Sequence, residues 1–198
     1  LPCLSISRIG KHISHASVIA NMIDANPPFY SIYYINTYIT FSVIYIFPLV
    51  IVFFKKIKLN YKNILIAMGF TFLLSLFPVK PSMATLEFTD YKTVGFIHQA
   101  LVELLGYESL WLKIVLAFFL LVGCYINIEL LKRFYQYIKT KSFDTKLIFT
   151  LMWILFILIM PLSYQVWEKY LTMILPFFIL SIYLLLYPNH KIIQEVRN

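Results

Sequence analysis

Residues 110–131 read LWLKIVLAFFLLVGCYINIELL, and this stretch decides the fold. A helix needs about 17–25 mainly apolar residues to cross the roughly 30 Å of hydrocarbon in a bilayer. The run is long enough for that. Comparable runs lie before and after it, the second of them short: Tyr30–Phe54, Asn63–Pro78, Leu147–Ser163 and Leu171–Tyr187. The pattern predicts an all-α integral membrane protein with about five transmembrane helices.

The composition of the 198 residues points to the same class. Hydrophobic residues make up 61% of the chain and aromatic residues 18%, with a mean hydropathy of +0.79. A water-soluble fold could not cover so much apolar surface, so the bilayer is the expected solvent. The apolar runs lack the alternation of barrel strands, which favours helices with internally bonded backbones. With no internal repeat, residues 1–198 are expected to form a single membrane domain.

The net charge of +8 predicts the topology. Eleven of the 17 basic residues fall on one side of the predicted spans, which the positive-inside rule assigns to the cytoplasm. A nucleic-acid-binding protein would gather such residues on one folded surface, whereas here they occupy short loops beside lipid. The eleven residues are Lys55, Lys56, Lys58, Lys62, Lys132, Arg133, Lys139, Lys141, Lys146, Lys191 and Arg197.

Two longer segments, residues 1–29 and 79–109, are expected to face outward with residues 164–170. The first is an arm that carries no signal-peptide pattern. Because an outward arm needs a means of translocation, we expect the chain to be the C-terminal part of a longer protein. Cys3 and Cys124 lie too far apart along the predicted topology to suggest a disulfide framework.

An interfacial helix is predicted at about Thr93–Leu105. Its apolar residues recur on one face, His98 and Glu103 lie on the other face, directed away from hydrocarbon, and Gly106 can end it. The segment is either a packed loop or a lid over a lipid-borne substrate. The apolar residues are Phe96, Ile97, Ala100, Leu101, Leu104 and Leu105.

The outward arm contains a cationic cluster within Arg8–His15. Lys11, His12 and His15 can all donate to phosphate oxygens, which favours an anion clamp. Zinc binding has little support, because no Cys, Asp or Glu lies at ligand spacing. A solvated loop is the other interpretation.

A short polar island, Gln165–Tyr170, separates the last two apolar runs. It places Glu168 and Lys169 beside a span of minimal length, and such charges usually face a cavity or each other. The alternative is an interfacial turn in which Trp167 and Tyr170 belong to the aromatic belt and Lys169 extends toward water.

Two motifs resemble the GT-C glycosyltransferase superfamily, integral membrane enzymes that take sugars from polyprenyl-phosphate carriers. Glu168-Lys169-Tyr170-Leu171 followed by Pro176 is similar to the acid, base, aromatic and apolar order before a late span. Gly10-Lys11-His12-Ile13-Ser14-His15 precedes Pro28-Phe29-Tyr30 as in the dolichyl-phosphate-glucose-dependent glucosyltransferases of N-glycan assembly. Lys169 stands where arginine is common, and Lys11 where an acid is expected.

The resemblance implies transfer of a sugar from a polyprenyl-phosphate donor to a lipid-linked or glycan acceptor. From the residues themselves we expect no metal site and no cofactor. It implies a multi-pass protein of the bacterial inner membrane or the endoplasmic reticulum. The catalytic base of such enzymes lies in an earlier outward loop, so none is assigned here. The substrate-binding candidates are Glu168, Lys169, Tyr170, Trp167, Lys11, His12, His15, Asp90 and Lys92.

A non-enzymatic membrane protein is the alternative, either part of a transporter or a scaffold subunit. The chain has no paired Gly/Pro-broken spans typical of transporters and no filter-like sequence. A scaffold subunit remains compatible with the sequence.

Overall fold

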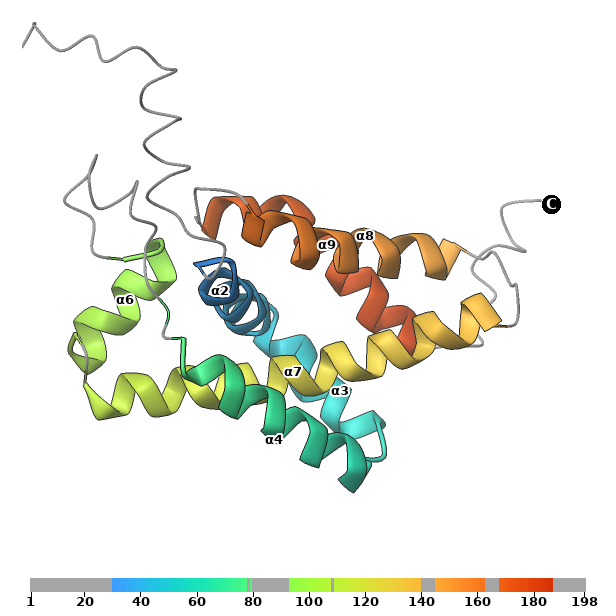
Figure 1. Cartoon of the computed structure of the whole chain (residues 1–198), viewed down its shortest axis with the longest axis horizontal. Helices are drawn as coiled ribbons and strands as arrows, with labels where there is room; N and C mark the ends of the chain where they lie inside the picture. The colour runs from blue at the N-terminus through green and yellow to red at the C-terminus, as the bar shows by residue number, and fades with distance from the viewer. Residues whose placement is uncertain are drawn as a thin grey trace, which may run out of the picture.

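The chain is helical in every regular element of the part that the computed structural model describes. That part comprises residues 30–77, 79, 93–107, 109–139, 145–162 and 168–186. The predicted all-α class is therefore confirmed (Figure 1). The elements in chain order are α2 (Tyr30–Tyr45), α3 (Phe47–Lys56), α4 (Tyr61–Ser75), α6 (Phe96–Leu105), α7 (Leu110–Lys139), α8 (Thr145–Ile159), the 3-10 turn η2 (Met160–Leu162) and α9 (Glu168–Leu186).

Fewer helices have spanning length than the sequence predicts. By length and composition, α7 and the Lys169–Leu186 part of α9 can cross a membrane, and a bent α2–α3 pair makes a third candidate. The expected α4 and α8 spans are helices of 15 residues each. At 1.5 Å per residue each covers only about 22 Å, which is less than the hydrocarbon thickness. Two or three apolar helices are compatible with a membrane protein.

The first predicted span, Tyr30–Phe54, is not one straight helix. It breaks at Ile46, and the two parts are bent by 83°. Pro48 explains the break, because proline has no N–H to donate and its ring clashes with the carbonyl group four residues earlier. Pro48 is instead well placed in the first turn of α3, where helical N–H groups have no partner in the helix.

The helix α7 is the centre of the packing. It lies along α4 and α2, while α8 packs along α9. Trp153 of α8 stacks on Phe178 of α9 with ring centroids 4.0 Å apart. The Trp153 indole donates to Asn127 of α7 at 2.8 Å, so this one side chain of α8 contacts both α9 and α7.

A glycine brings α2 and α7 into direct contact. A Cβ atom added at Gly123 would lie 2.9 Å from the carbonyl oxygen of Ile39 and closer still to its side chain. Only a residue without a side chain fits between these backbones, as at small-residue contacts in membrane helices. Gly123 therefore sets the distance between the two helices.

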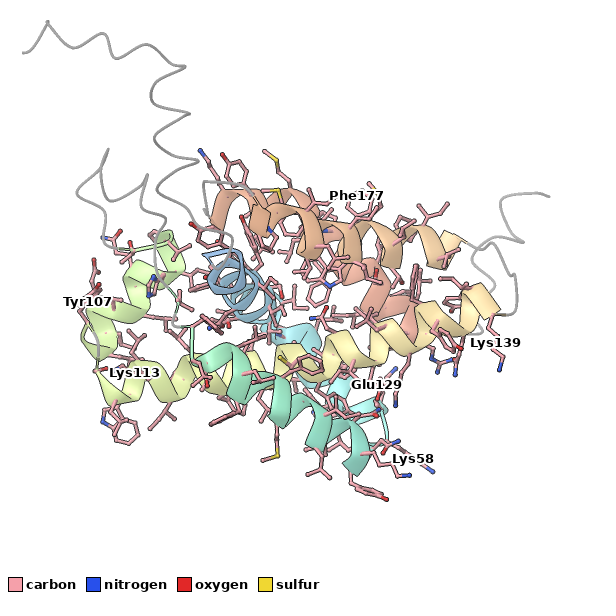
Figure 2. The ribbon with its side chains drawn as sticks, viewed as in Figure 1. Lys58, Tyr107, Lys113, Glu129, Lys139 and Phe177 are labelled. Atoms are coloured by element: carbon pink, nitrogen blue, oxygen red, sulfur yellow. The ribbon has the colours of Figure 1, made fainter. Side chains whose placement is uncertain are left out.

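The bundle has two chemically different ends (Figure 2). Lys58 and Lys139 lie toward one end, and Tyr107 and Lys113 toward the other. We call the first the basic end; it holds residues 55–62 and the C-terminal half of α7. The second is the α6 end, which holds α6, the end of α4 and the start of α7. The separation agrees with the predicted topology, and which end faces the cytoplasm stays a prediction.

Candidate functional site

Most of the predicted substrate-binding residues lie outside the described part of the chain. Lys11, His12, His15, Asp90, Lys92 and Trp167 are all in this group, and the Glu168 side chain is as well. Lys169 and Tyr170 are in the first turn of α9, and Lys169 is exposed. The ammonium of Lys169 lies 5.3 Å from the centroid of the Tyr170 ring. The structure thus neither assembles nor separates the predicted cluster.

A cavity of about 480 Å³ opens at the α6 end, between helices that are distant in sequence. The end of α4, the middle of α2 and the first turns of α7 enclose it. Its lining is apolar along one side and polar at Asn36, Ser75 and Lys113, a combination typical of small-ligand sites. The remaining lining residues are Val79, Ile114, Leu116, Ala117 and Leu120.

Asn36 positions the wall that α4 contributes to this cavity. Its side-chain amide donates to the carbonyl oxygens of Phe77 at 2.7 Å and Leu74 at 3.2 Å. Thr40, one turn later on α2, donates to the Asn36 oxygen at 3.0 Å. Phe77 follows the end of α4, and the Leu74 carbonyl also accepts from the backbone N–H of Phe77 at 3.0 Å, so Asn36 adds a bond from the neighbouring helix. The α4 terminus is therefore held against α2.

Lys113 is the cation of the cavity. It is exposed, and it lies in the first turn of α7, where the positive end of the helix dipole disfavours a cation. An anion bound at the cavity would relieve that repulsion and gain a charge-assisted hydrogen bond. Lys113 is one of the six basic residues that the predicted topology places on the outer side, and it was not among the predicted site residues. A lysine at the end of an apolar run usually extends to the membrane interface, so the sequence alone gave no signal of a site there.

The helix predicted at about Thr93–Leu105 is present as α6, and its place at a membrane interface stays a prediction. Gly106 ends it with a φ of 89°, a conformation that favours glycine, as expected. The face predicted to be apolar is partly exposed: Phe96 is 81% and Leu104 79% exposed. The prediction placed His98 away from hydrocarbon, and in the structure other parts of the protein cover that side chain, which is 4% exposed.

His98 is buried because it has a local role in starting α6. Its Nδ1 accepts a hydrogen bond from the backbone N–H of Val94 at 3.1 Å, and its ring lies 5.7 Å from that of Phe41. Burial lowers the pKa of His98 from 6.5 to about 4, because the protonated ring would lose its hydration. His98 is thus a neutral contact between α6 and α2.

A second polar cluster, which sequence reasoning missed, joins α4 to α7 at the basic end. Asn63 is buried and contacts two side chains one turn apart on α7: its amide donates to Glu129 and its oxygen accepts from Lys132. The backbone N–H of Asn60 donates to the Tyr125 hydroxyl at 3.3 Å. These contacts hold the start of α4 in register with α7.

The described part of the chain has two carboxylate side chains, Glu103 and Glu129. Glu103 is exposed and accepts a hydrogen bond from Gln99 at 2.9 Å, and neither carboxylate lines the cavity at the α6 end. Within these same residues no group of three His, Cys, Asp or Glu side chains could hold a metal ion. The polar groups at the cavity, among the residues that the structure describes, are therefore the Lys113 ammonium, the Asn36 amide and the Ser75 hydroxyl.

Comparison with known proteins found no matching family model, no matching curated protein and no matching solved structure.

Proposed function

We propose that this chain forms part of a multi-pass membrane glycosyltransferase of the GT-C type, which takes a sugar from a polyprenyl-phosphate carrier. The observation that carries the proposal is the cavity at the α6 end. It combines an apolar wall with Lys113, Asn36 and Ser75, and a lipid phosphate presents the same combination of a chain and an anionic group. The resemblance of residues 168–176 and 10–15 to the superfamily supports the same substrate class.

In the proposed reaction the acceptor hydroxyl attacks the anomeric carbon of the sugar. The bond from that carbon to the phosphate oxygen breaks, and polyprenyl phosphate leaves with the electron pair. Lys113 at the cavity would stabilise the leaving phosphate, since donors fixed where negative charge develops lower the barrier. The resemblance of residues 168–176 to the superfamily assigns Lys169 to donor binding. The hydroxyl proton passes to a base that is not assigned among these residues.

The proposed topology has five crossings. Besides α7 and α9, the bent α2–α3 pair makes one crossing, and α4 and α8 make two shorter ones. Residues that flank α4 and α8, together with local thinning of the bilayer, would compensate for their length. The membrane is the bacterial inner membrane or the endoplasmic reticulum.

A non-enzymatic scaffold subunit is the second candidate. The observation that favours it is the position of the two described carboxylates, since neither lies at the cavity. A scaffold would use an exposed apolar face, such as that of Leu65 and Phe72 on α4, to hold a partner subunit and would need no lipid-sugar binding.

Binding of the donor separates the two candidates. The full-length protein in nanodiscs is titrated with dolichyl-phosphate glucose and, separately, with an undecaprenyl-phosphate sugar. Lys113→Met should weaken binding by about 10–100-fold, because a charge-assisted hydrogen bond contributes about 1.5–3 kcal/mol. Lys169→Met should weaken it as well, whereas Lys139→Met at the basic end should not.

The controls make a negative result meaningful. Each variant should keep the helical circular dichroism and the size-exclusion profile of the unaltered protein. If the unaltered protein binds neither donor, or if Lys113→Met binds as tightly as Lys139→Met, the transferase proposal fails and the scaffold is favoured.

A further inference from the structure

A groove of about 620 Å³ lies between the middle of the bundle and the basic end, and it shares no lining residue with the cavity described above. It runs between α3, α4 and the middle of α7. Its lining is almost entirely apolar and includes four phenylalanines, with Lys55 and Tyr125 as its polar members. The phenylalanines are Phe47, Phe54, Phe118 and Phe119. This size is within the range of about 300–1,000 Å³ typical of ligand pockets.

The groove owes its shape to the bend before α3. With α3 bent by 83° from α2, its Val50 and Phe53 pack inward while Ile51 remains 44% exposed beside the groove. On the opposite side Ala67 of α4 is fully buried and is the smallest lining residue. A bend on one side and a small residue on the other leave a channel that the protein's own side chains do not fill.

The walls are suited to a flexible hydrocarbon chain. The rings of Phe47 and Phe119 meet edge to face with centroids 5.7 Å apart, and those of Phe54 and Tyr125 are 5.8 Å apart. Water would gain few hydrogen bonds in such a groove, so an apolar occupant is favoured. In a bilayer the most abundant apolar occupant is an acyl chain.

The charges beside the groove select among lipids. Lys55 lines it, and the segment KKIKLNYK, residues 55–62, contains four lysines and no acid. The bond from Asn60 to the Tyr125 hydroxyl ties this segment to the groove wall. Glu129, the described carboxylate of this end, is bonded to Asn63. Basic pockets between membrane helices on the cytoplasmic side recognise anionic headgroups, at about 1 kcal/mol per lysine near the surface.

We propose that the groove binds an acyl chain of an anionic glycerophospholipid, whose headgroup phosphate contacts Lys55 and Lys58. The bound lipid spans the opening between α3 and the α4–α7 pair and so stabilises the bent arrangement. This proposal is independent of the glycosyltransferase proposal, because the groove and the cavity at the α6 end share no lining residue.

The experiment compares lipids that differ only in the headgroup. The full-length protein in a neutral detergent is titrated with phosphatidylglycerol and with phosphatidylcholine of the same acyl chains, and bound lipid is counted by native mass spectrometry. Free glycerol 3-phosphate tests the headgroup alone. Phosphatidylglycerol should bind at least about fivefold more tightly than phosphatidylcholine, and glycerol 3-phosphate should not bind measurably.

Three variants separate the effect of charge from the effect of the groove. Lys55→Gln/Lys58→Gln should abolish the preference for phosphatidylglycerol while phosphatidylcholine binding persists. Arg133→Gln/Lys139→Gln removes the same charge from the same end but does not line the groove, so the preference should remain. Ile51→Trp fills the groove from an exposed position and should weaken both lipids without loss of helical content.

Three outcomes would overturn the proposal. Equal binding of the two lipids by the unaltered protein removes the headgroup preference. Unchanged binding by Ile51→Trp removes the groove as the site. If Leu65→Cys forms a disulfide-linked dimer and that dimer binds no lipid, the groove belongs to a contact with a second copy of the chain.

Discussion

The two ends of the bundle use polar residues in different ways. At the α6 end, Asn36 bonds to backbone carbonyls and leaves Lys113 exposed at a cavity. At the basic end, Asn63 bonds to side chains of α7, and the lysines lie beside an apolar groove. Both asparagines join two helices, but Asn36 bonds to the backbone at the end of α4 and Asn63 bonds to side chains of α7. The same residue type in a similar apolar context therefore bonds to different groups at the two ends.

The sidedness of the two ends is the most direct test, because its expected effect is all or none. With Cys3 and Cys124 changed to Ser, Lys58→Cys should react with a membrane-impermeant maleimide only from the cytoplasmic side. Tyr107→Cys should react only from the outer side, as the positive-inside rule requires. The measurement is labelling of inside-out and right-side-out vesicles. Labelling of both positions from one side would break the comparison.

The helix α7 runs between the two ends, and its close packing against α2 depends on Gly123. Gly123→Leu should destabilise the protein by about 3 kcal/mol or more, because the new side chain meets the backbone and side chain of Ile39. Gly69→Leu is the matched control, since a Cβ atom at Gly69 meets nothing within 4 Å. Thermal unfolding in one detergent measures both. Equal stability of the two variants would contradict the close α2–α7 contact.

The attachment of α6 should weaken in acid. The folded pKa of His98, about 4, is below its unfolded value of 6.5, so the unfolded state binds more protons between these values. This contribution is therefore fully present above pH 6.5 and is lost as the pH falls toward 4, by at most about 3 kcal/mol.

Hydrogen exchange of α6 amides at pH 7 and pH 5, corrected for intrinsic rates, measures this loss. Exchange in α4 serves as the internal reference at the basic end. In His98→Gln, which does not titrate in this range, the difference between α6 and α4 should no longer vary with pH. If the exchange of α6 amides relative to α4 did not change with pH in the unaltered protein, His98 would not be buried against α2.

The polar contact at the basic end should have a smaller effect. Asn63→Leu removes the amide that donates to Glu129 and should cost about 1–3 kcal/mol, since a partly buried carboxylate loses a donor. Lys62→Leu, at the adjacent exposed position, should change stability by less than about 0.5 kcal/mol. Thermal unfolding measures both variants. If Asn63→Leu were as stable as Lys62→Leu, Glu129 and Lys132 would have to replace the lost hydrogen bonds by pairing with each other.

The sequence by itself was sufficient to predict the helical class and the positions of most helices. Apolar runs near 20 residues leave the backbone few alternatives to internal hydrogen bonding, and Gly106 ends α6 as predicted. The break before Pro48 was not predicted, because Tyr30–Phe54 was expected to form one span. Proline indicates that a helix breaks, but the 83° angle depends on what the following helix packs against.

Only the tertiary structure decided where the polar residues act. Asn36, Ser75 and Lys113 meet at one cavity although they lie on three helices, and no local pattern connects them. His98 lies on the polar face of its helical period, yet Phe41 of another helix covers it. Periodicity assigns a residue to a face of its own helix, whereas burial depends on which neighbour covers that face. Local sequence therefore determined the helices, and long-range packing determined their chemistry.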